Sequence, residues 1–286
     1  MSLKDAKVTK EGIFLETLQK KVLIVPVRLT FTKPSPKSSR TPFFNNQTIS
    51  KLFSANLSRY TIIFEKERKR SRRIIFLPYF SNSSLSQLSS NSKHFLNNFA
   101  RLLKELDLEL LPIEAMNFFQ NLQKKFPKTI TEISSGIFKI QGNEKSFYIS
   151  TMQMPFTNTE EKKNLSFYIQ DFFAMITYGR VIIDVKHSSS DKSNTPISQA
   201  AVRITLEAPS LAIIKQDLKR VLSLIKIFIN KPLNQLKEPF LLLDQNLLQE
   251  NYGKIILDQG WDFEVATCDE LLKFIDLFQL VIPKKE

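Results

Sequence analysis

The sequence predicts an α+β protein, in which an antiparallel or mixed β-sheet is packed by amphipathic helices and carries a projecting basic β-hairpin. Two observations support this class. Short β-branched runs come first, helical-period segments follow, and the remaining half is mixed. A hydrophobic content of 42% with 24 Phe in 286 residues is enough for a large core. The chain fits one domain, or a basic β-rich segment 1–80 followed by an α+β body 81–286.

The first predicted element is a strand. Residues 22–31 alternate in polarity and are rich in β-branched side chains, and Pro26 within them indicates an edge strand or a bulge. Residues 32–50 and 81–92 are rich in Pro, Ser and Asn, so we expect loops there.

A charged β-hairpin is predicted between these two loops. Residues 60–64 and 74–80 are short apolar β-branched or aromatic runs. The segment that joins them, residues 65–73, reads EKERKRSRR and contains no apolar residue. Two strands around such a segment favour a hairpin whose tip is almost entirely charged.

Helices and further strands follow. Apolar residues at helical spacing predict a helix at 93–110, and Pro112 suits the first turn of a second helix at 113–126. The remaining predicted strands are 137–140, 146–150, 172–177, 181–186, 201–206 and a pair within 254–265. The remaining predicted helices are 210–230, 240–251 and 267–280. No internal repeat at a fixed period is visible.

The charge is concentrated in one part of the chain. Residues 17–80 carry 14 Lys and Arg against two Glu, whereas the other 222 residues carry 27 against 26. A Lys-rich composition explains the 30 scattered lysines, but it does not explain four of the 11 arginines within residues 68–73. Because Arg pairs with phosphate or carboxylate through a planar fork of donors, the cluster indicates an anionic partner.

The leading hypothesis is therefore a non-catalytic interaction protein that binds an anionic macromolecule, either nucleic acid or a ribonucleoprotein. A two-stranded basic ribbon can follow a phosphate backbone. An anionic lipid surface or an acidic protein is the alternative partner. The candidate contact residues are Lys66, Arg68, Lys69, Arg70, Arg72 and Arg73.

A second pattern suggests chemistry. Asp171 precedes the strand 181–186, which ends in Asp184-Val185-Lys186. This arrangement resembles the D…(D/E)xK pattern of restriction-endonuclease-like nucleases. The resemblance implies that Asp171 and Asp184 hold a divalent cation and that Lys186 activates the hydrolytic water, with Glu160 or Glu161 completing the set.

Other classes are disfavoured. The chain has six Gly and no GxGxxG or GxxxxGK[ST] motif, which argues against Rossmann and P-loop enzymes. Cys268, His94 and His187 are too few for a structural zinc site, so we expect no metal and no cofactor. A lone Cys and the lack of a membrane-length apolar run suggest a cytoplasmic protein without a transmembrane segment. A third hypothesis is a scaffold or adaptor subunit of a protein complex, including one at a membrane surface.

Overall fold

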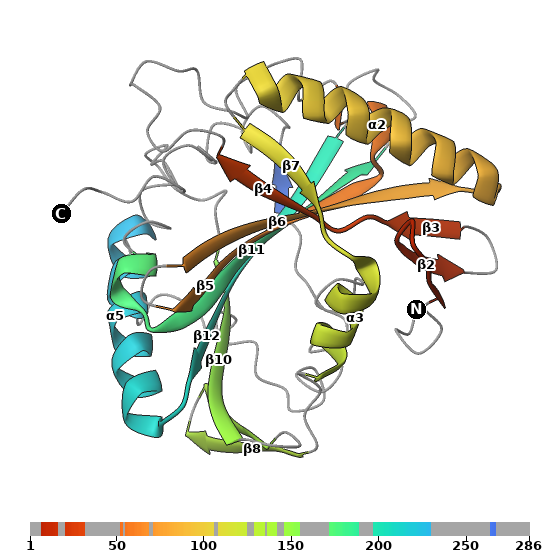
Figure 1. Cartoon of the computed structure of the whole chain (residues 1–286). Helices are drawn as coiled ribbons and strands as arrows, with labels where there is room; N and C mark the ends of the chain where they lie inside the picture. Colours follow the sequence, from red (N-terminus) through yellow and green to blue (C-terminus); the bar gives the residue numbers. More distant parts are fainter. Residues whose placement is uncertain are drawn as a thin grey trace.

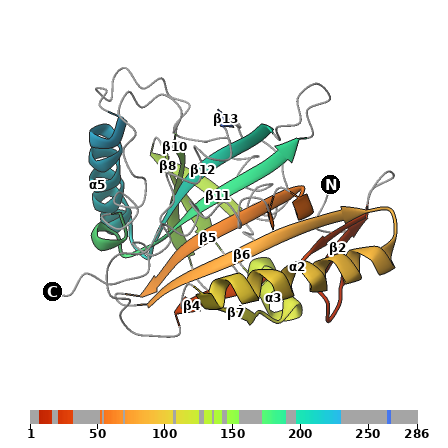
Figure 2. The ribbon, with the colours of Figure 1, turned by 90° about the horizontal axis from the view of Figure 1, so that it is seen from above.

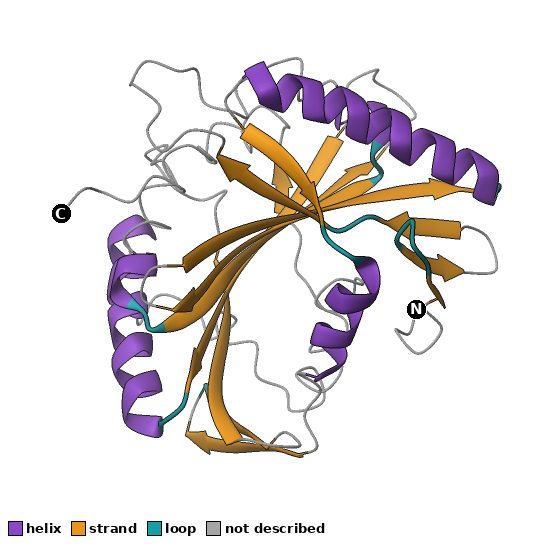
Figure 3. Cartoon of the chain, in the orientation of Figure 1, coloured by secondary structure: helices purple, strands orange, loops and turns teal. Residues whose placement is uncertain are grey.

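The computed structural model is a mixed α/β structure built on one large, strongly twisted sheet (Figure 1). Among the described residues every strand pairing is antiparallel. Helices flank the sheet, as the colouring by secondary structure shows (Figure 3). The described residues are 7–16, 21–31, 52–53, 55–68, 71–105, 108–124, 129–134, 136–141, 146–154, 172–188, 197–229 and 264–266.

The sheet has the order β1-β2-β3-β6-β5-β11-β12-β10-β9-β8, with β4 paired to β6 and β7, and β13 paired to β12. The strands are β1 (Lys7–Val8), β2 (Ile13–Glu16), β3 (Lys21–Ile24), β4 (Val27–Phe31), β5 (Arg59–Arg68), β6 (Ser71–Asn82), β7 (Leu108–Pro112), β8 (Thr129–Ser134), β9 (Ile137–Gln141), β10 (Ser146–Met154), β11 (Tyr178–Ser188), β12 (Ile197–Ala208) and β13 (Glu264–Ala266). The long helices are α2 (Leu85–Glu105), α3 (Ala115–Lys124) and α5 (Leu211–Ile229), and residues 172–175 form a short helical segment.

Several predicted elements are confirmed. The strands at 137–140 and 146–150 are β9 and β10, which form a hairpin. The helix expected at 210–230 is α5. The strand expected at 22–31 is interrupted at Pro26, and its two parts become β3 and β4. This interruption agrees with the irregularity that proline imposes on a sheet.

Two predictions around α2 are wrong. The Ser- and Asn-rich segment 81–92 is not a loop throughout, because α2 begins at Leu85. The Asn82 side chain accepts a hydrogen bond from the Ser84 backbone N–H, and Leu88 is buried, so a local cap and core packing outweigh the polar composition. Residues 108–110, predicted as the end of a helix, and Pro112, predicted in the first turn of the next helix, belong instead to strand β7, which pairs with β4.

The segment 172–177 is also not the predicted strand. It contains a short helical segment that buries Phe172, Phe173 and Ile176 against the sheet. Strand β11 follows this segment and pairs with β5 on one side and β12 on the other. Residues 172–177 therefore do not form a hairpin with β11. The helices expected at 240–251 and 267–280, and the loop at 32–50, lie outside the described residues.

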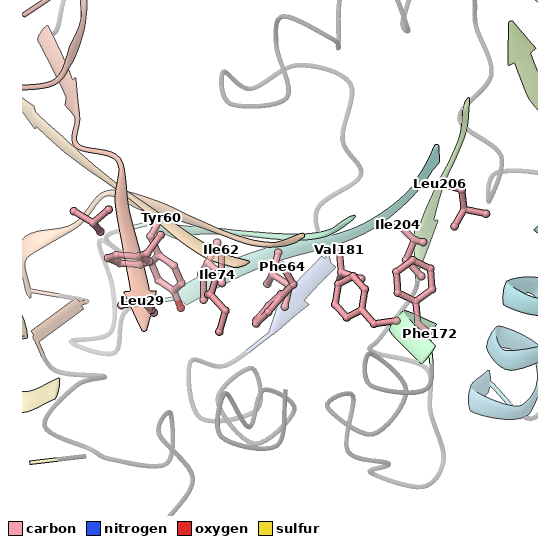
Figure 4. Packing of buried hydrophobic residues seen from close by; sticks show 14 of the residues in the cluster. Leu29, Tyr60, Ile62, Phe64, Ile74, Phe172, Val181, Ile204 and Leu206 are labelled. Carbon is pink, nitrogen blue, oxygen red and sulfur yellow. The ribbon is translucent and has the colours of Figure 1, made fainter. Parts of the chain in front are cut away.

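The main core lies on one face of the sheet, called here the first face. Its side chains alternate along the central strands (Figure 4), and α2 and α5 both cover it, through residues such as Phe99 and Ile214. The opposite face, called here the second face, is covered in part by Phe118 and Phe119 of α3. Ile63 of β5 and Ile182 of β11 belong to this second face.

The two halves of the sheet are related by an approximate two-fold axis. Ile63 pairs with Ile182 at the junction of β5 and β11. A helical turn precedes each of these strands. Before β5 the Leu57 N–H donates to the Phe53 carbonyl, and before β11 the Ile176 N–H donates to the Phe172 carbonyl. Placing Phe53 on Phe172 also places Ile63 on Ile182, so the axis passes through this pair.

The main strand order follows the same symmetry. In it five strands lie on each side of the junction, and each half contains a three-stranded meander, a short helical segment, a hairpin and a long helix. Strands β4, β7 and β13 and helix α3 lie outside this correspondence. The first turn of each meander has a glycine with a positive φ, Gly12 at 153° and Gly136 at 81°. The sheet is continuous across residue 80, because β6 spans it. The domain division expected there stays a prediction.

Candidate functional site

The basic segment lies where β5 and β6 are joined. The ladder pairs Glu65 with Arg73, Lys66 with Arg72 and Arg68 with Ser71, with a register shift between Lys66 and Arg68. Such a shift marks a bulge, which increases the local twist of a ribbon. For Arg68 and Arg72 we describe the backbone alone, and Lys69 and Arg70 lie outside the described residues. The Arg73 side chain is exposed.

Lys66 has a role at the base of this segment. Its ammonium group donates to the backbone carbonyls of Phe173 and Ile176, each at 2.6 Å. These carbonyls belong to the end of the short helical segment 172–175, where a cation is electrostatically favoured. Lys66 thus joins the basic segment of the first half to a turn of the second half.

Arg180 of the second half lies beside the acidic residue that precedes the basic segment, Glu65. Glu65 lies 4.0 Å from Arg180, its direct partner across the β5–β11 ladder. Arg180 also forms an ion pair with Glu207 of β12. All three side chains are at least half-buried. Arg180 therefore lies between two carboxylates, and its ion pair with Glu207 is the closer of the two.

The turn that contacts Lys66 is fixed to α5. Arg220 of α5 donates to the carbonyl of Met175 at 3.1 Å. The buried Asp217 accepts a hydrogen bond from the backbone N–H of Thr177, also at 3.1 Å. In Figures 1 and 2, α5 accordingly lies at the end of the sheet where β5 and β6 are joined.

The residues of the nuclease hypothesis are only partly described. Asp184 is 1% exposed on the second face. Its carboxylate accepts hydrogen bonds from both Nε and Nη2 of Arg59, and Thr61 donates to it at 3.2 Å. The side chain of Arg59 also lies over the ring of Tyr79, 5.0 Å from its centre. Asp171, Glu160 and Glu161 lie outside the described residues.

Arg203 completes this buried charge cluster. Its side chain is 2% exposed, and burial lowers the pKa of its guanidinium, while the negative charge of Asp184 opposes that shift. A divalent cation on Asp184 would compete with Arg59 and add positive charge beside Arg203. Within the described parts of the chain, no group of three or more His, Cys, Asp or Glu side chains could hold a metal ion. The nuclease hypothesis stays a prediction.

Other candidate residues have less structural context. Cys268 lies beyond the described residues, and of His187 only the backbone is described. His94 is exposed on α2, where its ring Nε2 lies 2.9 Å from the side-chain nitrogen of Asn98. Among the described helices, none is long and apolar enough to cross a membrane.

Comparisons with known proteins add no assignment: neither the family models nor the curated proteins gave a match to this chain.

Sequence reasoning found the basic segment but missed the residues around it. Arg59, Arg180 and Arg203 come from three strands, and their partners are distant in the sequence; Arg59 and Asp184 are separated by 125 residues. Charged residues at positions 180, 184 and 186, all of the same parity, were the available signal that one face of β11 is partly polar.

Proposed function

We propose that the protein binds an anionic macromolecule, nucleic acid or a ribonucleoprotein, through a basic hairpin that projects from the sheet, and that it does so without catalysis. The contacts are phosphate groups held by Arg68, Lys69, Arg70, Arg72 and Arg73. Lys66 supports the hairpin at its base through its two bonds to backbone carbonyls.

One observation carries this proposal: the two symmetry-related hairpins differ in charge. Residues 65–73, at the end of the β5–β6 hairpin, contain six Lys and Arg and two Glu. The corresponding end of the β11–β12 hairpin, residues 184–201, contains two Lys and two Asp. A general drift of composition toward Lys would affect both hairpins of one chain. The basic segment is therefore a local feature of the first hairpin, beyond what composition explains.

Nucleic acid is favoured over a membrane surface by the chemistry of the segment. The cations are mainly Arg, whose fork of donors matches a phosphate oxygen pair. Residues 65–73 contain no aromatic or aliphatic side chain that could enter a lipid interface. If the hairpin neutralises about four duplex phosphates, log K should fall with log salt at a slope of about −3.6.

The test replaces the five proposed contact residues by Ala and measures binding by fluorescence anisotropy over a salt series. Labelled RNA, duplex DNA and anionic vesicles serve as probes. We expect the variant to bind RNA or DNA more weakly and with a flatter salt dependence, because fewer phosphates are neutralised.

The matched control replaces Lys186 and Lys192 of the other hairpin by Ala, and it should leave binding unchanged. Affinity that is the same in wild type and in the five-residue variant contradicts the proposal. Binding to vesicles alone would assign the segment to a lipid surface instead.

A further inference from the structure

We propose that the nucleic acid is single-stranded and that Tyr178 stacks on one of its bases. This inference rests on the proposed function above and specifies its ligand. Proteins that bind single strands combine a basic track for the backbone with aromatic rings for the bases. The end of the sheet that carries the basic hairpin has both components.

The first component of the argument is exposure. Among the described residues, Tyr178 is the exposed aromatic side chain, at 36%, and Met175 nearby is 38% exposed. Two large apolar side chains are thus open to solvent within four residues of each other. They flank Ile176 and Thr177, whose backbone groups bind Lys66 and Asp217 respectively.

The second component is position. Gly179 pairs with Lys66 in the β5–β11 ladder, so Tyr178 lies one residue closer to the basic end of the hairpin. The last pair of the β5–β6 ladder joins Arg68 to Ser71, and Arg68 follows Lys66 by two residues along β5. At a rise of about 3.3 Å per residue this is roughly 7 Å. The backbone of Tyr178 and that of the basic segment are therefore close enough to contact one short stretch of a strand.

The third component is rigidity. Tyr178 follows a turn that is held from two sides, by Lys66 of β5 and by Asp217 and Arg220 of α5. On the other side it enters the β11–β12 ladder opposite Glu207, which forms an ion pair with Arg180. A ring whose backbone is fixed in the free protein loses little conformational entropy when a base stacks on it.

These features select single strands over duplexes. Bases in a duplex are already stacked and paired, and a ring beside the strand reaches only a base that is splayed out. Phosphate contacts from the hairpin suit both forms, whereas stacking on Tyr178 adds affinity only for the single strand. The preference for single strands over duplexes should therefore depend on the Tyr178 ring. The affinity for both forms should depend on the cations of the hairpin.

The experiment compares labelled oligo(U) RNA with its duplex formed with oligo(A), using fluorescence anisotropy at one salt concentration. Tyr178→Leu should weaken binding to the single strand at least about fivefold and leave duplex binding unchanged. Tyr178→Phe keeps the ring and should bind the single strand as wild type does. Leu111→Ala, at a side chain with 37% exposure on β7, is the matched control and should change neither.

The outcomes separate this inference from the proposed function. Wild-type protein that binds neither RNA form and no DNA overturns both. Equal affinity for single strand and duplex, or a Tyr178→Leu variant with unchanged single-strand binding, overturns the stacking role while the hairpin proposal stands. Thermal unfolding of each variant shows whether a loss of affinity reflects a loss of the fold.

Discussion

At the scale of single residues, the buried pair of Arg59 and Asp184 has the largest expected energetic effect. Arg59 is 7% and Asp184 1% exposed, and each comes from a different half of the sheet. Removing one partner of such a pair leaves a charge buried without compensation, which costs more than the pair contributes relative to apolar residues. Arg203 adds a second buried cation that depends on the same carboxylate.

We therefore expect Asp184→Asn to destabilise the protein by about 3–5 kcal/mol, measured by urea unfolding. Arg203→Met should lower the free energy of unfolding by less, because it removes a buried cation and leaves the Arg59–Asp184 pair in place. The exposed pair of Lys93 and Glu11 provides the control, and Glu11→Gln should change stability by no more than about 1 kcal/mol. An Asp184→Asn variant as stable as the Glu11→Gln variant would show that the Asp184 carboxylate does not stabilise the β5–β11 junction.

At the scale of elements, the sequence predicted what is local and missed what depends on pairing. The apolar stripe of α5 and the alternation in β9 and β10 were sufficient to locate those elements. The start of α2 was missed because Ser and Asn favour loops when their packing partners are unknown. The helical segment 172–175 is only one turn long, and its apolar residues resemble a buried strand.

The candidate site shows the same limit. Residues 65–73 are contiguous, so their charge is visible without any structure. The ion pairs around Arg180 and Asp184 require the strand order and register, which one sequence does not contain. The internal symmetry was not visible either, because few corresponding positions carry the same residue, as Phe53 and Phe172 do, whereas the main strand order agrees between the two halves.

Helices α2 and α5 occupy corresponding places, and Arg220 of α5 contacts the turn before β11. If bound nucleic acid extends along α5, replacing the exposed Lys215 and Lys219 by Ala should weaken binding and reduce the magnitude of the salt slope by about 1.8. Replacing the exposed Lys93 and Arg101 of α2 by Ala should have no effect. Salt titrations of RNA binding measure both, and equal slopes for the two variants would restrict the contact to the hairpin.

At the scale of the whole molecule, the two halves are joined through the centre of one sheet. The β5–β11 ladder runs from the pair of Gly179 and Lys66 to that of Lys186 and Arg59. Side chains cross it in both directions, from Lys66 to the second half and from Arg180 to Glu65. A junction with this many shared backbone and ionic contacts favours cooperative unfolding of both halves.

We expect the protein to unfold in one thermal transition and both Phe99→Ala in α2 and Ile214→Ala in α5 to lower its midpoint temperature. Each substitution leaves a cavity in the shared core on the first face. The expected losses are about 3–5 kcal/mol for Phe99 and about 2–5 kcal/mol for Ile214. Differential scanning calorimetry measures the transition. Two resolved transitions, each lowered by only one of the variants, would show instead that the halves unfold separately.

The two halves that the two-fold axis relates differ in net charge. Residues 1–128, which include the first half of the sheet, carry 23 Lys and Arg against 9 Asp and Glu, whereas residues 129–286 carry 18 against 19. A homodimer of identical units would have its charge balanced about the axis. Here the two units lie in one chain, and their sequences differ by 15 charges. If the partner is a polyanion, such a charge imbalance between the units would favour approach of the more basic unit first and would make the association rate sensitive to ionic strength.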